Sequence, residues 1–350
     1  MYSYLIVGSG YRSEYFARIA KTYPELFRAM YLCRSSEKAE KMTERTGVKA
    51  SDDLQACLAF GPDFVVVCVD RNHNAEVAET WLDRGYRVLS EVPAGSTEAE
   101  LKRIWMKGQE GKRIVFCEQY HRQPVLQAGL EAVRAGIIGK PHSLYLSLLH
   151  DYHGASLIRR CLDIPVGEAF SAAGLFQCSP AAETDSRTGA SYDGRMQQEE
   201  RTMVQLAFAS GKTALYDFAS VQYRSFIRSR HLTLRGERGE WNDTQLLWLD
   251  SENRPRRTPL TPEVPEQYRI LDTQALRDRR RNWTAELAPD TVQDEFAIAA
   301  MLLDMGEGKE PYPLEEALED AYYWLIFQQA VQTPGRQVQS GVMPWHAAKH

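Results

Sequence analysis

The first 120 residues alternate between short apolar runs and segments whose apolar residues recur every three or four positions. The apolar runs predict strands at Tyr4–Val7, Ala29–Cys33, Asp63–Val69, Arg87–Leu89 and Arg113–Cys117. The segments between them predict helices over Tyr11–Tyr23, Glu37–Thr46, Asn74–Gly85 and Thr97–Lys107. Strands that alternate with helices at this spacing are typical of βαβ units. Residues 1–121 are therefore predicted to form a doubly wound α/β domain with a parallel sheet.

Beyond Pro124 the pattern changes to longer runs with partial two-residue alternation. After a predicted helix at Val125–Ala135, such runs lie at His142–Leu149, Thr202–Ala209, Thr213–Ala219 and His231–Arg235. Few helical segments separate them, which favours an open, mainly antiparallel sheet. Two further helices are predicted near the end of the chain, at Asp294–Met305 and Leu314–Gln332. Residues 122–350 are thus predicted to form a second, α+β domain.

Three polar segments interrupt this pattern. Ala181–Glu200 has almost no apolar residues and is expected to be a lid, an intersubunit arm or a disordered loop. Pro255–Pro265 is predicted as another loop. The basic cluster Arg277–Arg281 is interpreted as a solvated face.

Composition narrows the class of protein. Apolar residues make up 43% and charged residues 25% of the chain, and 42 basic against 47 acidic residues give a net charge of −5. This balance disfavours nucleic acid as a partner, and no apolar run reaches the ~18–20 residues that span a bilayer. The six cysteines are scattered without paired spacing, which favours reduced thiols over disulfides or a zinc site. Together with the lack of an export signal, these features predict a cytoplasmic protein.

A glycine-rich turn joins the first strand to the first helix. Gly8, Ser9, Gly10, Tyr11 and Arg12 occupy this turn. Glycines here permit a tight bend and let a pyrophosphate approach the helix N-terminus. The turn predicts dinucleotide binding, although a merely tight turn between strand and helix stays open.

The end of the second strand bears on the choice of cofactor. An acidic residue there would bind the ribose 2′-hydroxyl of NAD, whereas an arginine accommodates the 2′-phosphate of NADP. This chain has Arg34, Ser35 and Ser36 and no acid before Glu37. NADP is therefore favoured over NAD, with a surface role for Arg34 and a helix cap at Ser35 or Ser36 as the alternative.

Polar residues also follow the next two strands. Asp70, Asn72 and His73 come after Asp63–Val69, and Glu91 and Val92 follow the strand at Arg87–Leu89. Ligands of open α/β sheets bind outside the carboxyl ends of the strands. Gly8, Asp70 and Glu91 are therefore expected to meet in one crevice. Tyr120 and His121 follow the last strand and are expected to face it too.

These segments together resemble the Gfo/Idh/MocA family. The resemblance rests on the GxG turn, "GYRVLSEVP", "EQYHRQP" followed by "GIIGKP", "LRGERGEW" and "EFAIAAMLLDMGEGKEPYPLEEALEDAYY". It implies an NAD(P)-binding Rossmann domain followed by a substrate domain with a large open sheet. It also implies an oxidoreductase that acts on CH–OH groups of a carbohydrate-like small molecule. Arg122 matches a family arginine that contacts cofactor or fixes the domain junction.

The chain departs from the family at its proton-transfer residues. The family has Glu-Lys-Pro where this chain has Glu91-Val92-Pro93, and valine cannot carry a proton. By resemblance the catalytic histidine is His153, at the end of a predicted strand run from His142 to Tyr152. The acids expected four residues before and three after it are replaced by Leu149 and Ser156.

The candidate catalytic residues are accordingly His153, with Asp151 and Tyr120 as helpers. A histidine near neutral pKa suits a general base, especially beside a carboxylate. Alternatively, His153 caps a helix at Ala155–Leu162. A metal site at His150-x-x-His153 has no further ligand pattern to support it, so no metal is predicted.

Three functions remain open at this stage. The first is an NAD(P)-dependent oxidoreductase on a sugar, polyol or derivative. The others are an NAD-dependent glycosidase, which "Glu-Val-Pro-Ala" resembles, and a cofactor-binding sensor or partner subunit that has lost catalysis. The exposed face of an open sheet is expected to be covered by a second copy of the chain, which predicts a homodimer or homotetramer.

Overall fold

The computed structural model describes residues 1–350 except 187–188, 280–290 and 349–350. Its first sheet has the strand order β3-β2-β1-β4-β5-β6, and every pair of neighbours is parallel. The strands are β1 (Tyr2–Val7), β2 (Phe27–Leu32), β3 (Ala50–Ser51), β4 (Phe64–Val67), β5 (Val88–Ser90) and β6 (Ile114–Phe116). The helices between them are α1 (Ser13–Thr22), α2 (Ser36–Thr46), α3 (Leu54–Ala59), α4 (Arg71–Asp83) and α5 (Glu98–Gln109).

This sheet confirms the predicted Rossmann domain. Every residue of β4 is buried, as an apolar strand covered by helices on both faces requires. The strand order reverses between β1 and β4, and a crevice forms at such a switch point beyond the carboxyl ends of the strands. The crossover helices were located to within a few residues, but α3 and the two-residue β3 were not predicted.

The second sheet has nine strands in the order β16-β15-β14-β13-β7-β12-β11-β8-β17. They are β7 (Pro141–Ser147), β8 (Phe170–Ala182), β11 (Met196–Phe208), β12 (Thr213–Ala219), β13 (His231–Gly236), β14 (Gly239–Asn242), β15 (Gln245–Leu249), β16 (Pro255–Pro259) and β17 (Val338–Gln339). Only β12 and β7 pair in parallel. The predicted large, mainly antiparallel sheet is therefore confirmed.

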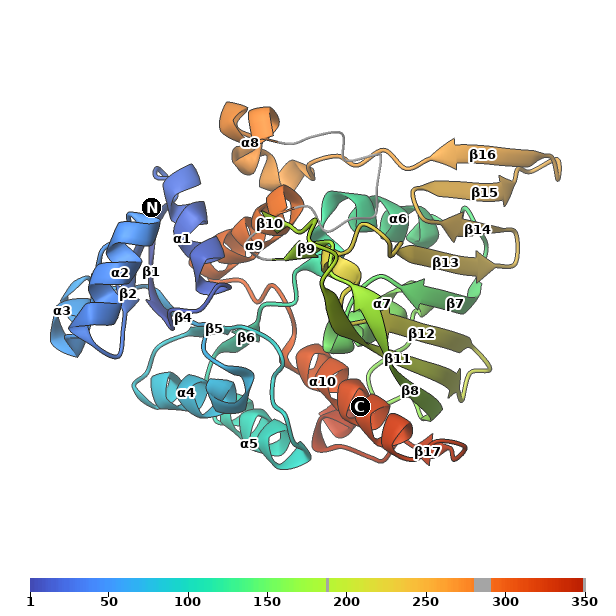
Figure 1. Ribbon diagram of the computed structural model, residues 1–350, viewed down its shortest axis with the longest axis horizontal. Coiled ribbons are helices and arrows are strands. Elements are labelled where there is room, and N and C mark those ends of the chain that lie inside the picture. The colour runs from blue at the N-terminus through green and yellow to red at the C-terminus, as the bar shows by residue number, and fades with distance from the viewer. Residues whose placement is uncertain (187–188, 280–290, 349–350) are drawn as a thin grey trace.

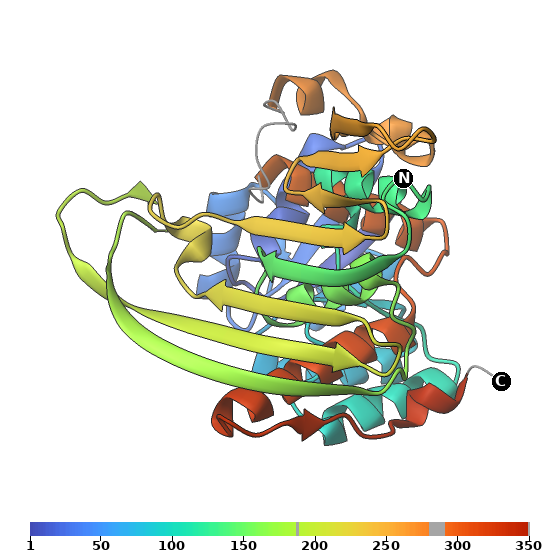
Figure 2. The same cartoon turned by 90° about the vertical axis from the view of Figure 1, so that its right-hand side faces the viewer.

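Two segments predicted as loops contain strands. β8 and β11 pair along all of their residues, from Phe170 with Phe208 to Ala182 with Met196, so residues 183–195 of the segment 181–200 lie outside them. There, the short strands β9 (Asp185–Ser186) and β10 (Gly189–Ala190) form a hairpin. Figure 2 shows this ribbon extending well beyond the other strands. The ribbon carries exposed apolar side chains, among them Leu175, Phe176 and Met196, beside its polar ones, and the backbone groups of its two strands pair with each other.

The loop predicted at Pro255–Pro265 also needs correction. Its first half is β16, which pairs with β15 at the sheet edge. All five residues of β16 are exposed, and prolines are tolerated there because an edge strand leaves some N–H positions unpaired. In the basic cluster 277–281, residues 280–281 lie outside the described residues. Arg277 and Arg279 lie at the end of α8 (Gln274–Arg279) and form ion pairs with Asp272 and Glu295.

Helices cover one face of the second sheet and connect it to the first domain (Figure 1). They are α6 (Pro124–Arg134), α7 (Asp151–Leu162), α9 (Thr291–Gly306) and α10 (Leu314–Gln332). α10 packs on α7 and β8 and also reaches α5, while α9 packs on α1. The chain thus returns to the Rossmann domain after building the sheet. The boundary at 121/122 stays a prediction; it falls within a short 3₁₀ helix, Tyr120–Arg122.

In the part of the chain that the structure describes, no helix covers the outer face of the second sheet, and the strands lie in front of the helices in Figure 2. Leu175 on β8 and Leu215 on β12 are exposed there. The expected homodimer or homotetramer stays a prediction. Among the described residues, five of the six cysteines are buried and none is paired, and no helix is long and apolar enough to cross a membrane.

One buried cation joins α7 to α10. Arg159 donates to Asp320 Oδ1 at 2.7 Å and to Glu316 Oε2 at 2.6 Å, and its side chain is 2% exposed. Such a pair stabilises a fold mainly in the sense that removing one partner leaves a buried charge uncompensated.

We therefore expect Arg159→Leu to lower the free energy of unfolding by about 3–5 kcal/mol. The matched control is Arg269→Leu, whose ion pair with Glu266 is more than 70% exposed on both sides and is expected to matter by about 1 kcal/mol or less. Chemical denaturation of both variants measures the difference. Equal losses of stability would contradict the assignment.

Candidate functional site

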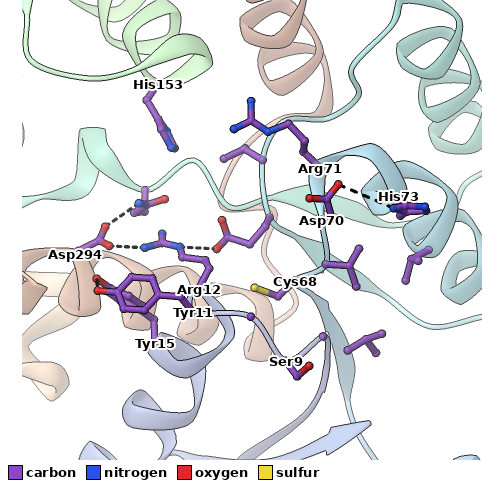
Figure 3. Close-up of a pocket in the computed structure, with 18 of the residues that line it drawn as sticks. Ser9, Tyr11, Arg12, Tyr15, Cys68, Asp70, Arg71, His73, His153 and Asp294 are labelled. Carbon is purple, nitrogen blue, oxygen red and sulfur yellow. Dashed lines mark hydrogen bonds and ion pairs between the residues drawn. The ribbon is translucent and has the colours of Figure 1, made fainter. Parts of the chain in front are cut away.

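A cavity of about 1200 Å³ opens at the carboxyl ends of β1, β2, β4 and β5, between the two domains (Figure 3). This volume exceeds that of most single-ligand pockets, about 300–1000 Å³, and leaves room for a dinucleotide beside a substrate. Most of the residues singled out from sequence line it, namely Gly8, Ser9, Gly10, Tyr11, Arg12, Arg34, Asp70, His73, Glu91, Val92, Tyr120 and His153. The expected convergence of Gly8, Asp70 and Glu91 on one crevice is thus present in the structure.

The two glycines of the first turn have different roles. Gly8 has φ of +125°, and a Cβ there would lie 2.0 Å from the carbonyl oxygen of Cys68 at the end of β4. Gly8 therefore lets the turn pack against the neighbouring strand. A Cβ at Gly10 would meet no protein atom within 4 Å, so the space above this residue is open for a ligand. The turn fits a pyrophosphate at the N-terminal end of α1.

Basic and apolar residues line the cavity beside the end of β2. Arg34 and Lys38 contribute cations. Lys38 was not among the residues predicted from the sequence, although it lies two residues after Ser36. Leu32, Val69 and Val77 form an apolar part of the wall that suits an adenine ring. Ser35 caps α2 by accepting the Lys38 N–H, and neither Ser35 nor Ser36 lines the cavity.

Arg12 binds two carboxylates across the cavity floor. Its Nε donates to Glu91 Oε1 at 3.0 Å and its Nη1 to Asp294 Oδ2 at 2.5 Å. Gln119 donates to the other oxygen of Asp294 at 2.7 Å. Figure 3 shows this chain of contacts running from the first turn to α9. Sequence reasoning placed Arg12 and Glu91 at the cofactor but missed Asp294, which lies 282 residues from Arg12 in the chain.

A side chain of α4 fixes the segment that follows β5. Asn74 on α4 donates to the hydroxyl of Ser90 at 2.9 Å and to the backbone carbonyl of Glu91. Val92 lines the cavity at the position where the family has lysine. Burial raises the pKa of Glu91, although Arg12 beside it favours the charged form.

His153 lies on a helix and not at a strand end, which corrects the prediction of a strand run up to Tyr152. β7 ends at Ser147, and His153 occupies the first turn of α7, which starts at Asp151. From there its ring projects toward the cavity (Figure 3). No side chain of the HDYH segment caps this helix; instead, the Asp151 N–H donates to the Tyr216 hydroxyl at 2.8 Å.

The partner of His153 comes from the other domain. Its Nδ1 lies 2.5 Å from Oε2 of Glu118, two residues beyond β6. The Glu118 side chain is only 2% exposed. From the sequence, a carboxylate was expected within four residues of His153, so Glu118 was not predicted as its partner. The available indication was an acid directly after the Arg113–Cys117 strand, where site residues are expected.

Burial controls the protonation of this pair. It raises the pKa of Glu118 to about 8 and holds the pKa of His153 well below its usual value. His150 also opposes charge on His153, while Arg160, His150 and Arg12 favour the Glu118 carboxylate. Near neutral pH the pair therefore carries no net charge.

Aromatic and charged residues surround His153. The rings of Tyr120 and His150 lie 4.5 and 4.8 Å from its ring, centre to centre. His150 Nδ1 lies 3.3 Å from Asp151 Oδ2, and Arg71 lies 3.8 Å from the same oxygen. Asp151 itself does not line the cavity. Among the described residues no group of three or more metal-ligating side chains occurs, so nothing there supports the alternative of a metal at His150 and His153.

Three other predicted residues lie outside the cavity wall. Asn72 is exposed, and its N–H donates to Asp70, which caps α4. Arg122 donates to the Tyr268 hydroxyl, to Asp304 and to the Pro311 carbonyl, which is the junction role named as its alternative. His121 does not face the crevice as expected; its ring lies 5.4 Å from that of Tyr312.

Comparison with known proteins agrees with this geometry. Residues 2–119 match the GFO_IDH_MocA model, an oxidoreductase family with an NAD-binding Rossmann fold. No curated protein sequence matches the chain.

Solved structures share the fold over nearly the whole chain. An NAD-binding oxidoreductase from Klebsiella pneumoniae has a TM-score of 0.72 at 12% identity, over 97% of this chain and 99% of that one. Levoglucosan dehydrogenase, solved with NADH and levoglucosan, has a TM-score of 0.69 at 14% identity, over 97% of this chain and 99% of that one. A putative myo-inositol dehydrogenase from Sinorhizobium meliloti 1021 has a TM-score of 0.65 at 14% identity, over 97% of this chain and 100% of that one. The resemblance inferred from sequence is confirmed.

The open space over Gly10 gives a direct test of cofactor binding. Gly10→Glu would place a bulky anion where a pyrophosphate is expected, so we predict that affinity for NADPH and NADH falls at least about tenfold while the protein remains folded. Titration by nucleotide fluorescence measures the affinity. Gly8→Ala serves as contrast, because its Cβ clashes with backbone and should reduce stability instead. Unchanged nucleotide affinity in folded Gly10→Glu would rule out this site.

Proposed function

We propose that this protein is an NAD(P)-dependent oxidoreductase that acts on a CH–OH group of a small carbohydrate-like molecule. The observation that carries the proposal is the His153–Glu118 pair, whose histidine lines the same cavity as the glycine turn of an NAD-binding domain. The relatives with similar folds include dehydrogenases described with levoglucosan and as acting on myo-inositol, which supports the substrate class.

The bound nicotinamide would accept or return the hydride. The protein must then move the hydroxyl proton, and His153 Nε2 is the atom placed to take it, because Nδ1 is committed to Glu118. An ionised Glu118 accepts Nδ1–H, which fixes the ring, leaves the Nε2 lone pair toward the cavity and stabilises the imidazolium that forms. Val92 takes no part in proton transfer. Glu118 thus acts as a positioning residue for His153.

We infer that the cofactor is NADP rather than NAD. Arg34 is exposed at the cavity beside the end of β2, and Lys38 on α2 lines the same wall. Two cations there match the charge of a 2′-phosphate. NAD+ or NADH is the nucleotide described with two of the relatives, so this preference would be a property of this chain.

Direct titration checks the cofactor preference. We expect tighter binding of NADPH than of NADH, and we expect Arg34→Ala to weaken NADPH about tenfold while leaving NADH unchanged. Lys38→Ala should have a smaller effect of the same sign. An unmodified protein that binds NADH as well as NADPH would contradict the preference.

The two alternative functions predict other outcomes. A sensor or partner subunit would bind nucleotide without turnover, and a redox-assisted glycosidase would cleave glycosides without net consumption of cofactor. A panel of sugars, polyols, sugar acids and aryl glycosides, assayed for NADPH change and for sugar release, distinguishes the three. The buried acid beside His153 favours catalysis, because a carboxylic acid in apolar surroundings is costly to keep without use.

Substitution of the pair tests the mechanism. His153→Ala should lower kcat by about 10²–10⁴-fold with cofactor affinity nearly intact. In the parent enzyme, oxidation should rise with pH through about 8, because the pKa of Glu118 is raised to about 8 and the lone pair of His153 Nε2 becomes available as Glu118 ionises. Glu118→Gln cannot ionise, so it should lose this inflection and part of the rate. A parental pH profile in Glu118→Gln, or full turnover in His153→Ala, would refute the assignment.

A further inference from the structure

Three arginines line the cavity from segments other than the glycine turn and the end of β2. Arg71 enters from the first turn of α4, and Arg224 and Arg230 enter from the segment after β12. In Figure 3, Arg71 and His153 lie on the same side of the cavity, and Ser9 of the glycine turn lies on the opposite side. A pyrophosphate over the turn would therefore leave Arg71 to a second ligand.

The positive charge of Arg71 is balanced by only one distant carboxylate of the described residues. Its nearest carboxylate oxygen is Asp151 Oδ2 at 3.8 Å, and the two side chains are 49% and 34% exposed. His150 lies closer to that same oxygen, at 3.3 Å. Arg12, by contrast, makes two close contacts with carboxylates that are at most 12% exposed. The charge of Arg12 is thus satisfied internally, whereas that of Arg71 is available to a ligand.

The second group of arginines is held in place by the wall of the substrate domain. Arg224 donates to the Ser186 carbonyl, and Arg230 donates to the Tyr223 carbonyl and lies 5.2 Å from the centre of the Tyr223 ring. The Tyr223 hydroxyl accepts the N–H of His150, three residues before His153. These contacts hold both arginines in the cavity wall, Arg230 beside Tyr223 and Arg224 at 5.9 Å from the centre of the Tyr11 ring.

Few acids line this end of the described cavity, and Asp151, the carboxylate nearest Arg71, is not among the residues that line it. The positions around His153 where the resemblance leads one to expect aspartates hold Leu149 and Ser156, both buried, and Ser156 bonds the Tyr312 hydroxyl. Of the acids lining the described cavity, Glu91 and Asp294 are bound by Arg12. The third, Asp70, caps α4. Cations therefore dominate where substrate must lie.

We propose that Arg71, with Arg224 and Arg230 on the facing wall, binds a carboxylate of the substrate, so that the substrate is a sugar-derived hydroxy acid such as an aldonic or uronic acid. A planar guanidinium fits a carboxylate in two parallel hydrogen bonds. The carboxylate held there would present a neighbouring CH–OH group to His153 Nε2. This inference rests on the proposed oxidoreductase function and narrows its substrate class.

Matched substrate pairs test the proposal. D-Galacturonate is compared with its methyl ester, and D-gluconate with D-glucitol, in NADP⁺-dependent turnover and in thermal-shift binding to the NADP⁺-saturated protein. The acid of at least one pair should exceed its neutral partner by about tenfold to a hundredfold in kcat/KM, the scale of a charge-assisted hydrogen bond. Arg71→Met should abolish that difference, Arg71→Lys should keep part of it, and NADPH affinity should change less than twofold in both. Arg84→Met, on an arginine just beyond the far end of α4, is the control and should behave as the parent does.

The outcomes separate this inference from the proposed function. If neutral partners react as well as acids and Arg71→Met changes neither, the carboxylate subsite is wrong and the oxidoreductase stands. If acids stabilise the protein through Arg71 but no compound is oxidised or reduced, the proposed function fails and the anion subsite stands. A loss of NADPH affinity in Arg71→Met as large as the loss for the acid would assign Arg71 to the cofactor and overturn the proposal. So would a failure of every acid to bind more tightly than its neutral partner.

Discussion

The ion-paired contact of Arg12 with Glu91 and Asp294 is the constraint on which the site depends. It joins the first turn of the Rossmann domain, the end of β5 and the first turn of α9, three segments far apart in the chain. Breaking such a buried network would leave two carboxylates uncompensated. Because α9 follows the second sheet, the same contact fixes the substrate domain over the carboxyl ends of the parallel strands. It does so together with the packing of α9 on α1 and of α10 on α5.

The pair of Glu118 and His153 is a consequence of that closure. Each residue belongs to a different domain, and neither has a close partner of this kind near it in sequence. Docking of α7 against the strand end at β6 buries both, and burial shifts their pKa values in opposite directions toward neutral forms. The lysine expected from the resemblance would supply a cation here, whereas Val92 supplies none. The proton instead lies within the neutral pair of the Glu118 carboxylic acid and the His153 imidazole. The chemistry that we propose thus follows from packing at the domain junction.

The positions of charge along the cavity divide it into parts. Arg34 and Lys38 lie at the end of β2, Arg12 is neutralised at the centre, and Arg71, Arg224 and Arg230 lie toward the substrate domain. Since paired cations attract a further anion only weakly, Arg12 organises the protein, whereas Arg71, whose nearest carboxylate oxygen is 3.8 Å away, can meet a ligand. Apolar wall residues between them suit the rings of a nucleotide. This distribution underlies both the cofactor preference and the substrate class that we infer.

The sequence by itself determined the Rossmann domain, its glycine turn, the mainly antiparallel second sheet and most of the residues that line the cavity. These depend on local periodicity and on the rule that parallel strands present their carboxyl ends at one edge, both of which are visible along the chain. The first half of β11 and all of β16 were not predicted, because polar strand segments outside the core lack apolar alternation. Only the tertiary structure decided that His153 begins a helix, that Glu118 is its partner and that Asp294 holds Arg12. Such long-range pairs leave no spacing pattern, because their free energy comes from shared burial at an interface that neither segment encodes alone.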